Sequence, residues 1–229
     1  MPHGHTREAT RRGPSGGARY NRPMERRPDN SPAKPAARAG RALAAAALAL
    51  ALASCGTPAP SQPADLSAYL QADMTGFSGF EVSSVSSVQF VDVTVQDVAQ
   101  LMEAGESFIL YCAYPGCPWC AAVSPVLNEV AAERGVKVCL LNTRKDPSWQ
   151  TNMDIDDYDL FVELFGEWLD EDENGDPHLY VPDLYVVSGG KVAANHAGVI
   201  EGYDDPAQPM TDEQRDALAD LLGTFFDMM

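Results

Sequence analysis

Positive charge is scarce in most of this 229-residue chain. Residues 56–229 carry six Lys or Arg against thirty Asp or Glu, a formal balance of −24. A body this acidic repels phosphate backbones, so nucleic acid is excluded as a partner of the folded part. Residues 1–55 have the opposite balance, with ten Lys or Arg against three Asp or Glu. The basic head therefore needs an explanation of its own.

Apolar runs long enough to span a bilayer are also missing. The uncharged Ala/Leu run Ala42–Ala53 has twelve residues, which suits the hydrophobic region of an export signal but not a stable membrane span. It leads into Leu52-Ala53-Ser54-Cys55, which resembles the bacterial lipobox. That resemblance implies cleavage before Cys55 and lipid on its sulfur and new amino terminus. The alternative is an ordinary signal followed by an unpaired cysteine.

These features predict three regions. Residues 1–54 form a disordered basic head and lipoprotein signal, with Met24 as an alternative start. Residues 55–64 form a Pro/Ser/Thr-rich, lipid-anchored linker, and residues 65–229 form the folded domain. The expected location is the extracytoplasmic side of the cell membrane.

The body alternates between strand-like and helix-like patterns, which indicates a mixed α/β domain. A strand is predicted at Ser87–Val93, followed by a helix capped by Thr94 and ended by Gly105. The further predicted elements are a buried strand at Ser107–Ala113, a helix from Cys117 to Glu133 closed by Gly135, a strand at Val136–Leu141, an amphipathic helix through Tyr158–Leu169, a hairpin of Leu179–Val187 with Lys191–His196, and a final helix capped by Thr211.

Cys117-Pro118-Trp119-Cys120 follows the buried strand and opens the next helix. Two cysteines three residues apart at a helix start share one face and lie close enough to form a disulfide. The first thiol faces unsatisfied N–H groups and the positive end of the helix dipole, which lower its pKa. The sequence therefore predicts Cys117 as nucleophile and the more buried Cys120 as resolving thiol.

The surrounding pattern resembles the thioredoxin family. Pro125 stands five residues after Cys120, and Val181-Pro182 matches the family's cis-proline. Gly190 and Gly198 follow that proline by eight and sixteen residues. The resemblance implies a thioredoxin-like fold, a central mixed β-sheet flanked by helices. It also implies a substrate groove at Trp119, Val181 and Pro182, support of the site by Pro118 and Pro125, and no dissociable cofactor.

Three departures shape the functional expectation. Tyr111 stands where classical thioredoxins have a buried Asp, the dipeptide between the cysteines is Pro-Trp, and an acidic helical insertion precedes the cis-Pro strand. The combination is most similar to thioredoxin-fold lipoproteins and bacteriocin-transport accessory proteins of Gram-positive bacteria. That similarity implies exchange with thiols or disulfides of exported proteins, coupled to a membrane or small-molecule thiol redox partner.

Cys112 and Cys139 are predicted on adjacent strands and on one face. Two small buried thiols are the favoured interpretation, with a second disulfide as the alternative. Their spacing with the dithiol also mimics an iron–sulfur pattern, which the position of Cys112 within a strand disfavours.

The acidic stretch from Asp154 to Asp176 contains eleven carboxylates, which favours a solvated helix face over a cationic partner. Asp170, Asp172 and Asn174 match the early positions of a calcium loop, but Val181 occupies the place of its bidentate Glu. A solvated Asn-Gly turn is thus favoured over calcium. His178 and His196 show no zinc-type spacing, so no metal is predicted.

Two functions from different classes fit the sequence. The first is a membrane-anchored thiol-disulfide oxidoreductase that acts on exported proteins. The alternative is a non-catalytic accessory or chaperone module for an exporter or a secreted partner, suggested by Tyr111 and by the acidic insertion.

Overall fold

The structure, a computed structural model, describes residues 62–77, 79–80, 87–144 and 155–229. The predicted signal, the lipidation candidate Cys55 and most of the predicted linker lie outside the described residues. Within the described ranges, no helix is long and apolar enough to cross a membrane.

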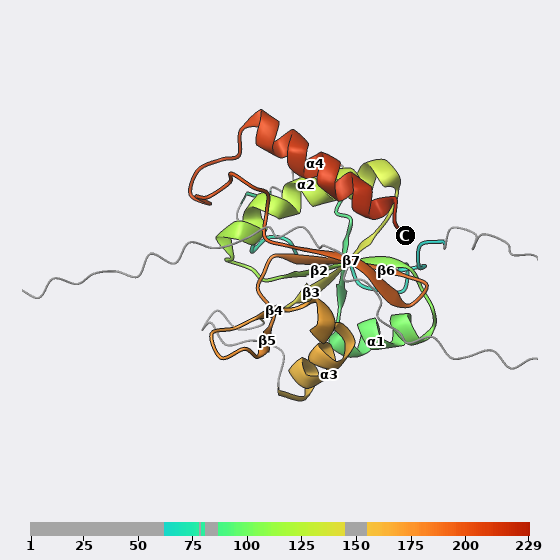
Figure 1. Ribbon diagram of the computed structural model, residues 1–229. Helices are drawn as coiled ribbons and strands as arrows, with labels where there is room; N and C mark the ends of the chain where they lie inside the picture. The colour runs from blue at the N-terminus through green and yellow to red at the C-terminus, as the bar shows by residue number, and fades with distance from the viewer. Residues whose placement is uncertain (1–61, 78, 81–86, 145–154) are drawn as a thin grey trace, which may run out of the picture. The chain divides into compact units, whose positions relative to one another are not determined.

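A five-stranded sheet in the order β1-β3-β2-β6-β7 forms the centre of the fold (Figure 1). Strands β1 (Phe90–Val93), β3 (Val138–Asn142) and β2 (Phe108–Ala113) run parallel, and β6 (Asp183–Ser188) and β7 (Lys191–Ala197) add antiparallel pairs. All six residues of β2 are buried, as expected for a central strand covered on both faces.

Helices cover both faces of this sheet, in line with the predicted fold class (Figure 1). Helices α2 (Pro118–Arg134) and α4 (Asp212–Phe226) pack on one face, here called the dithiol face. Helices α1 (Val95–Glu103) and α3 (Ile155–Phe165) lie on the other, here called the opposite face. A mixed sheet between helical layers is the thioredoxin-like architecture that the sequence predicts.

Local sequence signals set the helix ends. Thr94 and Thr211 each form a capping box with the residue three positions later, so the predicted starts of α1 and α4 are confirmed. Helix α2 ends at Gly135, whose φ of 65° is the left-handed conformation that glycine adopts without strain.

Several predicted boundaries are wrong. The first strand begins at Phe90 rather than at Ser87, and the amphipathic helix ends at Phe165, where Gly166 opens a short 3-10 turn (Gly166–Trp168). The residues that follow form a small two-stranded hairpin of β4 (Asp170–Glu171) and β5 (Pro177–His178). Leu179 to Pro182 precede β6 instead of belonging to it.

Residues 62–77 and 79–80, here called the N-terminal segment, attach to the sheet before the first strand begins. The N–H of Ala64 donates to the Ser107 carbonyl at 2.7 Å, and that of Ala72 donates to Phe90 at 3.0 Å. The segment also buries four apolar side chains in the core of the dithiol face: Ala72, Met74, Phe77 and Phe80. Pro63 and Ala64, which the sequence assigned to the linker, thus pair with Ser107.

Candidate active site

Cys117 is the N-cap residue of α2. Its backbone is extended, with φ −75° and ψ 115°, and Pro118 begins the helix, where its missing N–H costs no intrahelical bond. The Cys120 N–H donates to Cys117 Sγ at 3.1 Å. The sulfur therefore takes the place that a capping hydroxyl or carboxylate oxygen holds in other helices.

The two thiols are tuned in opposite directions. A hydrogen bond from the Cys120 thiol is the main cause that lowers the pKa of Cys117. The N–H groups of Cys120 and Trp119 and the charge of Arg144 lower it further, whereas burial raises it. Burial is the main cause that raises the pKa of Cys120 far above its ordinary value. The geometry therefore supports a thiolate at Cys117 and a protonated thiol at Cys120.

The predicted cis-proline lies beside this dithiol. The Val181–Pro182 peptide bond is cis, and Cys117 Sγ lies 4.0 Å from the Val181 carbonyl oxygen. The Pro182 carbonyl in turn accepts the Gly198 N–H at 2.8 Å. Two segments far apart in sequence thus meet at the nucleophile, as the spacing of the motif predicts.

Trp119 and Pro125 both belong to α2. The Trp119 ring packs edge-on against Tyr203, with centroids 5.9 Å apart, so a residue of the loop before α4 supports the dithiol. Pro125 sits inside α2 and lacks the N–H that would bond to the Ala121 carbonyl. A Cβ added to Gly79 would lie 3.7 Å from that carbonyl oxygen, so the N-terminal segment approaches the helix there.

Tyr111 and Ser124 form a buried pair of hydroxyls beneath the first turn of α2. The Tyr111 hydroxyl donates to the Cys120 carbonyl at 3.1 Å and lies 3.1 Å from Ser124 Oγ. The Ser124 hydroxyl also donates to the Cys120 carbonyl, at 2.7 Å. The sequence marked Tyr111 only as a departure, and nothing in it singled out Ser124.

Two further supports of the active-site loop were not predicted. Arg144 lies over the Tyr114 ring, 3.9 Å from its centroid. The Gly76 carbonyl accepts the N–H of Gly116, the residue before the nucleophile, at 3.1 Å. A Cβ on Gly76 would lie 2.7 Å from Pro115 Cβ, so glycine is required at this approach.

Cys112 and Cys139 lie on the opposite face as two free, fully buried thiols. Cys112 pairs in register with Leu141, and Cys139 with Leu110, so the two cysteines are offset by two residues. A strand spacing near 4.8 Å with that offset separates their Cα atoms by about 8 Å, which is too far for a disulfide. Burial raises the pKa of both thiols, that of Cys139 to about 12. The favoured interpretation as unpaired thiols is confirmed.

Asp183 is a buried carboxyl on the same opposite face. It lies in β6 and pairs directly with Cys112 of β2. It is 3% exposed, accepts a hydrogen bond from the Tyr185 hydroxyl, and leaves Oδ1 without a partner. Burial raises its pKa to about 8. No pattern in the sequence marked Asp183 as a buried carboxyl.

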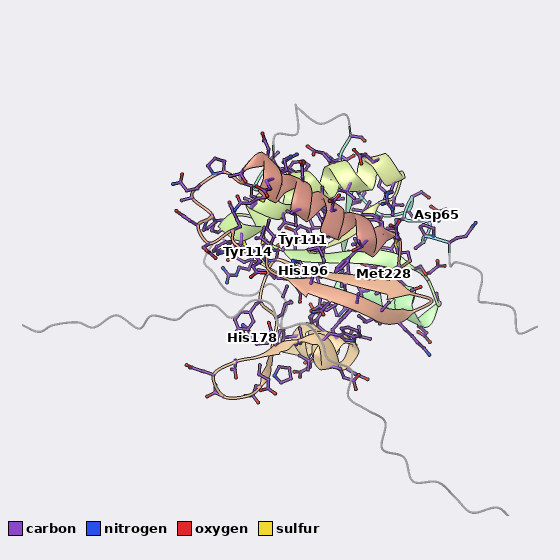
Figure 2. All side chains as sticks on the ribbon, turned by 45° about the horizontal axis from the view of Figure 1, so that its top comes forward. Asp65, Tyr111, Tyr114, His178, His196 and Met228 are labelled. Carbon is purple, nitrogen blue, oxygen red and sulfur yellow. The ribbon has the colours of Figure 1, made fainter. Side chains whose placement is uncertain are left out.

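The acidic loop forms a turn held by its own backbone. One Asp172 oxygen accepts the N–H groups of Asn174 and Asp176, at 2.8 and 3.0 Å, and these bonds lower the pKa of Asp172. The His178 ring of this hairpin lies tilted against the Tyr180 ring, with centroids 4.5 Å apart, and Figure 2 shows His178 away from His196. Among the described residues, no three His, Cys, Asp or Glu side chains gather as a metal site would require.

Comparisons with known proteins found distant structural likenesses. No family model matches the chain, and no curated protein matches it. A protein proposed to be an oxidoreductase with a thioredoxin fold shares 14% identity over 48% of this chain and 83% of its own, with a TM-score of 0.36. The short form of thioredoxin f from spinach chloroplast shares 13% sequence identity, over 62% of this chain and 99% of its own, with a TM-score of 0.37. A mutant thioredoxin of Halobacterium salinarum shares 14% identity, over 62% of this chain and 96% of its own, with a TM-score of 0.35.

These matches are too distant to assign chemistry to this chain. The thioredoxin-like architecture rests on the observed strand order, on α2 opening at the dithiol and on the cis-proline beside it. What that dithiol does follows from its own geometry.

Proposed function

We propose that this chain is a membrane-anchored thiol-disulfide oxidoreductase that exchanges disulfides with exported proteins through Cys117 and Cys120. The observation that carries the proposal is the pair of opposite thiol environments at one helix start. Cys117 Sγ accepts the Cys120 N–H at 3.1 Å, and Cys120 is fully buried behind it. A purely structural role gives no reason for this division between two neighbouring cysteines.

The exchange proceeds in two steps. The Cys117 thiolate attacks one sulfur of a substrate disulfide, forms a mixed disulfide and releases the other sulfur as a thiolate, which takes a proton from solvent. Cys120 then attacks Cys117 Sγ, forms the Cys117–Cys120 disulfide and releases the second substrate sulfur as a thiol. The substrate is reduced by two electrons and the enzyme is oxidised by two. A thiol redox partner restores the dithiol, and the same steps run backwards when the enzyme oxidises a substrate.

The carbonyl of Val181 supports the docking part of the proposal. It lies 4.0 Å from Cys117 Sγ, in the segment that precedes β6. A substrate strand can pair with backbone groups of this segment while its cysteine meets Cys117. Trp119, which is only partly buried, supplies an apolar wall next to the nucleophile.

Anchoring and location rest on the sequence alone. The run Ala42–Ala53 followed by Leu52-Ala53-Ser54-Cys55 supports export and lipidation at Cys55. We expect the full chain, expressed in a Gram-positive host, to incorporate radiolabelled palmitate and to fractionate with membranes. Cys55→Ala should lose both properties, while Cys112→Ala, the matched cysteine control, should keep them. A Cys55→Ala protein that still carries label would refute the anchor.

Trapping tests the chemistry directly. Cys120→Ser should accumulate mixed disulfides with a model peptide disulfide, because the resolving thiol is gone, and Cys117→Ser should abolish exchange. Cys112→Ala should exchange at the wild-type rate. Undiminished exchange by Cys117→Ser would refute the proposal. A double Cys117→Ser/Cys120→Ser variant that still supported the cellular role would favour the accessory module.

The direction of electron flow is a second measurement on the same site. Groups that stabilise the Cys117 thiolate favour the reduced form and make a dithiol more oxidising. We expect thiol trapping in redox buffers to give a potential above about −270 mV, toward the oxidase value of about −120 mV. A potential at or below about −270 mV would mean a reductase.

A further inference from the structure

The backbone of Cys120 is held by two side-chain hydroxyls that the exchange chemistry described above does not use. The Tyr111 hydroxyl donates to the Cys120 carbonyl at 3.1 Å, and the Ser124 hydroxyl donates to it at 2.7 Å. Both residues and Cys120 itself are 0% exposed. Tyr111 comes from the central strand β2, whereas Ser124 lies one turn along α2, so the two hydroxyls join the helix start to the sheet.

This carbonyl belongs to the residue that must move for the exchange to finish. In the mixed disulfide, Cys120 Sγ has to reach Cys117 Sγ and form a bond of about 2.05 Å. Cys120 lies in the first turn of α2, so its sulfur approaches only if the backbone beneath it is held in one orientation. Hydroxyl donors that grip the carbonyl restrict that backbone at the point where the sulfur is attached.

Among the described residues, no buried carboxylate lies beside Cys120 to act as a base in this step. The buried polar side chains among the described residues are Gln89, Ser107, Ser124, Asn128, Thr143 and Asp183. Asp183 is the single carboxylate in that set, and it lies on the opposite face, where it pairs with Cys112 of β2. The groups at Cys120 are thus neutral hydroxyls, so the proton of its thiol passes to the departing substrate sulfur as the new disulfide forms.

We propose that Tyr111 and Ser124 are positioning residues for the resolving step, a clamp on the Cys120 carbonyl that sets how fast mixed disulfides collapse. The clamp affects the first step less, because the Cys117 backbone is also fixed by groups outside Cys120. The Cys117 N–H donates to the Tyr114 carbonyl at 3.2 Å, and the Ala121 N–H donates to the Cys117 carbonyl at 3.0 Å. The inference rests on the proposed exchange function. It adds which residues set the rate of the second step, the attack of Cys120 on the mixed disulfide.

A single-turnover experiment on the full-length protein separates the two steps. Reduced protein is mixed with a peptide disulfide and quenched with acid at intervals. Mass spectrometry then counts the reduced, mixed-disulfide and oxidised forms at Cys117 and Cys120. The variants are Tyr111→Phe and Ser124→Ala. Tyr158→Phe is the matched control, because it removes a tyrosine hydroxyl bonded to the Pro177 carbonyl on the opposite face.

Tyr111→Phe should slow the collapse of the mixed disulfide about tenfold, as expected for the loss of one buried hydrogen bond, and change the attack rate less than about twofold. Ser124→Ala should slow collapse about threefold, because the helical N–H of residue 124 remains as a donor. The double variant should lose less than the product of the two factors, since both hydroxyls act on one carbonyl. Tyr158→Phe should alter neither step.

Equal slowing of both steps in Tyr111→Phe would mean a general loosening of α2 and would overturn the clamp. An unchanged rate of mixed-disulfide collapse in that variant would overturn it as well. If Tyr111→Phe fails to fold, Ser124→Ala decides by the same criterion. A wild-type protein that forms no mixed disulfide overturns the exchange function itself. A wild-type protein that completes exchange while the variants match it overturns the clamp alone.

Discussion

The two faces of one sheet place cysteines in opposite chemical situations. On the dithiol face, Cys117 caps α2 and its sulfur accepts an N–H, which favours the thiolate. On the opposite face, Cys112 and Cys139 lie within strands and burial raises the pKa of both thiols. Cys117 is itself only 3% exposed, so burial does not separate the reactive thiol from the inert ones. The position at a helix start, where N–H groups have no helical partner, separates them.

The faces also differ in the polar groups that they bury. The dithiol face holds the neutral hydroxyls of Tyr111 and Ser124 at the active-site helix. The opposite face holds the carboxyl of Asp183, bonded to Tyr185. Among the described residues, the buried carboxyl therefore lies on the face of the sheet away from the dithiol.

The largest expected difference between the faces is in alkylation. With a pKa of about 12, Cys139 is a thiolate about once in 10⁵ molecules at pH 7. In the native protein at pH 7, iodoacetamide should modify Cys117 at least about 10³-fold faster than Cys112 or Cys139, as read by peptide mass spectrometry. In denaturant the rates should converge. Comparable native rates would erase the distinction between the faces.

Asp183 should make stability depend on pH. Its pKa of about 8 in the folded protein exceeds the ordinary 3.8, so the folded state holds a proton that the unfolded state loses. The free energy of unfolding should therefore fall as the pH rises from about 4 to about 8, by on the order of 5 kcal/mol at most.

Asp183→Asn should remove that slope, because an amide does not titrate. Urea titrations of both proteins at several pH values would show it. The matched control is Asp172→Asn, which changes an exposed carboxyl of the β4–β5 turn. An Asp183→Asn protein with the wild-type slope would show that another group titrates.

The packing on the opposite face should matter for stability and not for exchange. Phe161 is fully buried on α3 and its ring stacks on Phe165, with centroids 4.7 Å apart. Phe161→Leu should lower the free energy of unfolding by about 1–2 kcal/mol, measured by urea denaturation. Exchange per folded molecule should stay at the wild-type rate. A slower rate would show that this face takes part in positioning the dithiol.

Arg144 should give the smallest effect of the four. It is the last of the causes that lower the pKa of Cys117, behind the hydrogen bonds from Cys120 and Trp119. Arg144→Gln should raise the pKa of Cys117 slightly, as followed by the ultraviolet absorbance of the thiolate across a pH titration. Lys137→Gln, which removes a cation bonded to the Val88 carbonyl, is the control and should leave the titration unchanged. An equal shift in both variants would indicate a long-range effect of net charge.

Local patterns explain what could be predicted. The helix at the dithiol, the cis-proline at Val181–Pro182 and the caps Thr94 and Thr211 depend on residues close together in sequence or on a known motif. Periodicity also placed Cys112 and Cys139 on one face, and the pairing register then excluded a bond between them.

The residues that were missed depend on tertiary contacts. The Ser124 hydroxyl bonds to Cys120 within its own helix, but its pairing with Tyr111 depends on β2, and Arg144 matters because it lies over the Tyr114 ring. In the sequence, Asp183 is simply a polar residue that follows a proline. It is buried because helices cover this face of the sheet. No periodicity records which side chains from distant segments will share a site.

The N-terminal segment has a mechanical consequence. Along the described part of the chain, the first backbone bonds from this segment to the sheet are made by the Ala64 N–H to Ser107, by the Leu70 carbonyl from Asp92 and by the Ala72 N–H to Phe90, and the contact of Gly76 with Gly116 comes later. A pull applied to the chain ahead of Pro63 is therefore resisted by these three bonds before any tension reaches the loop of Cys117. The N-terminal segment therefore isolates the loop of Cys117 from tension in the chain that precedes Pro63.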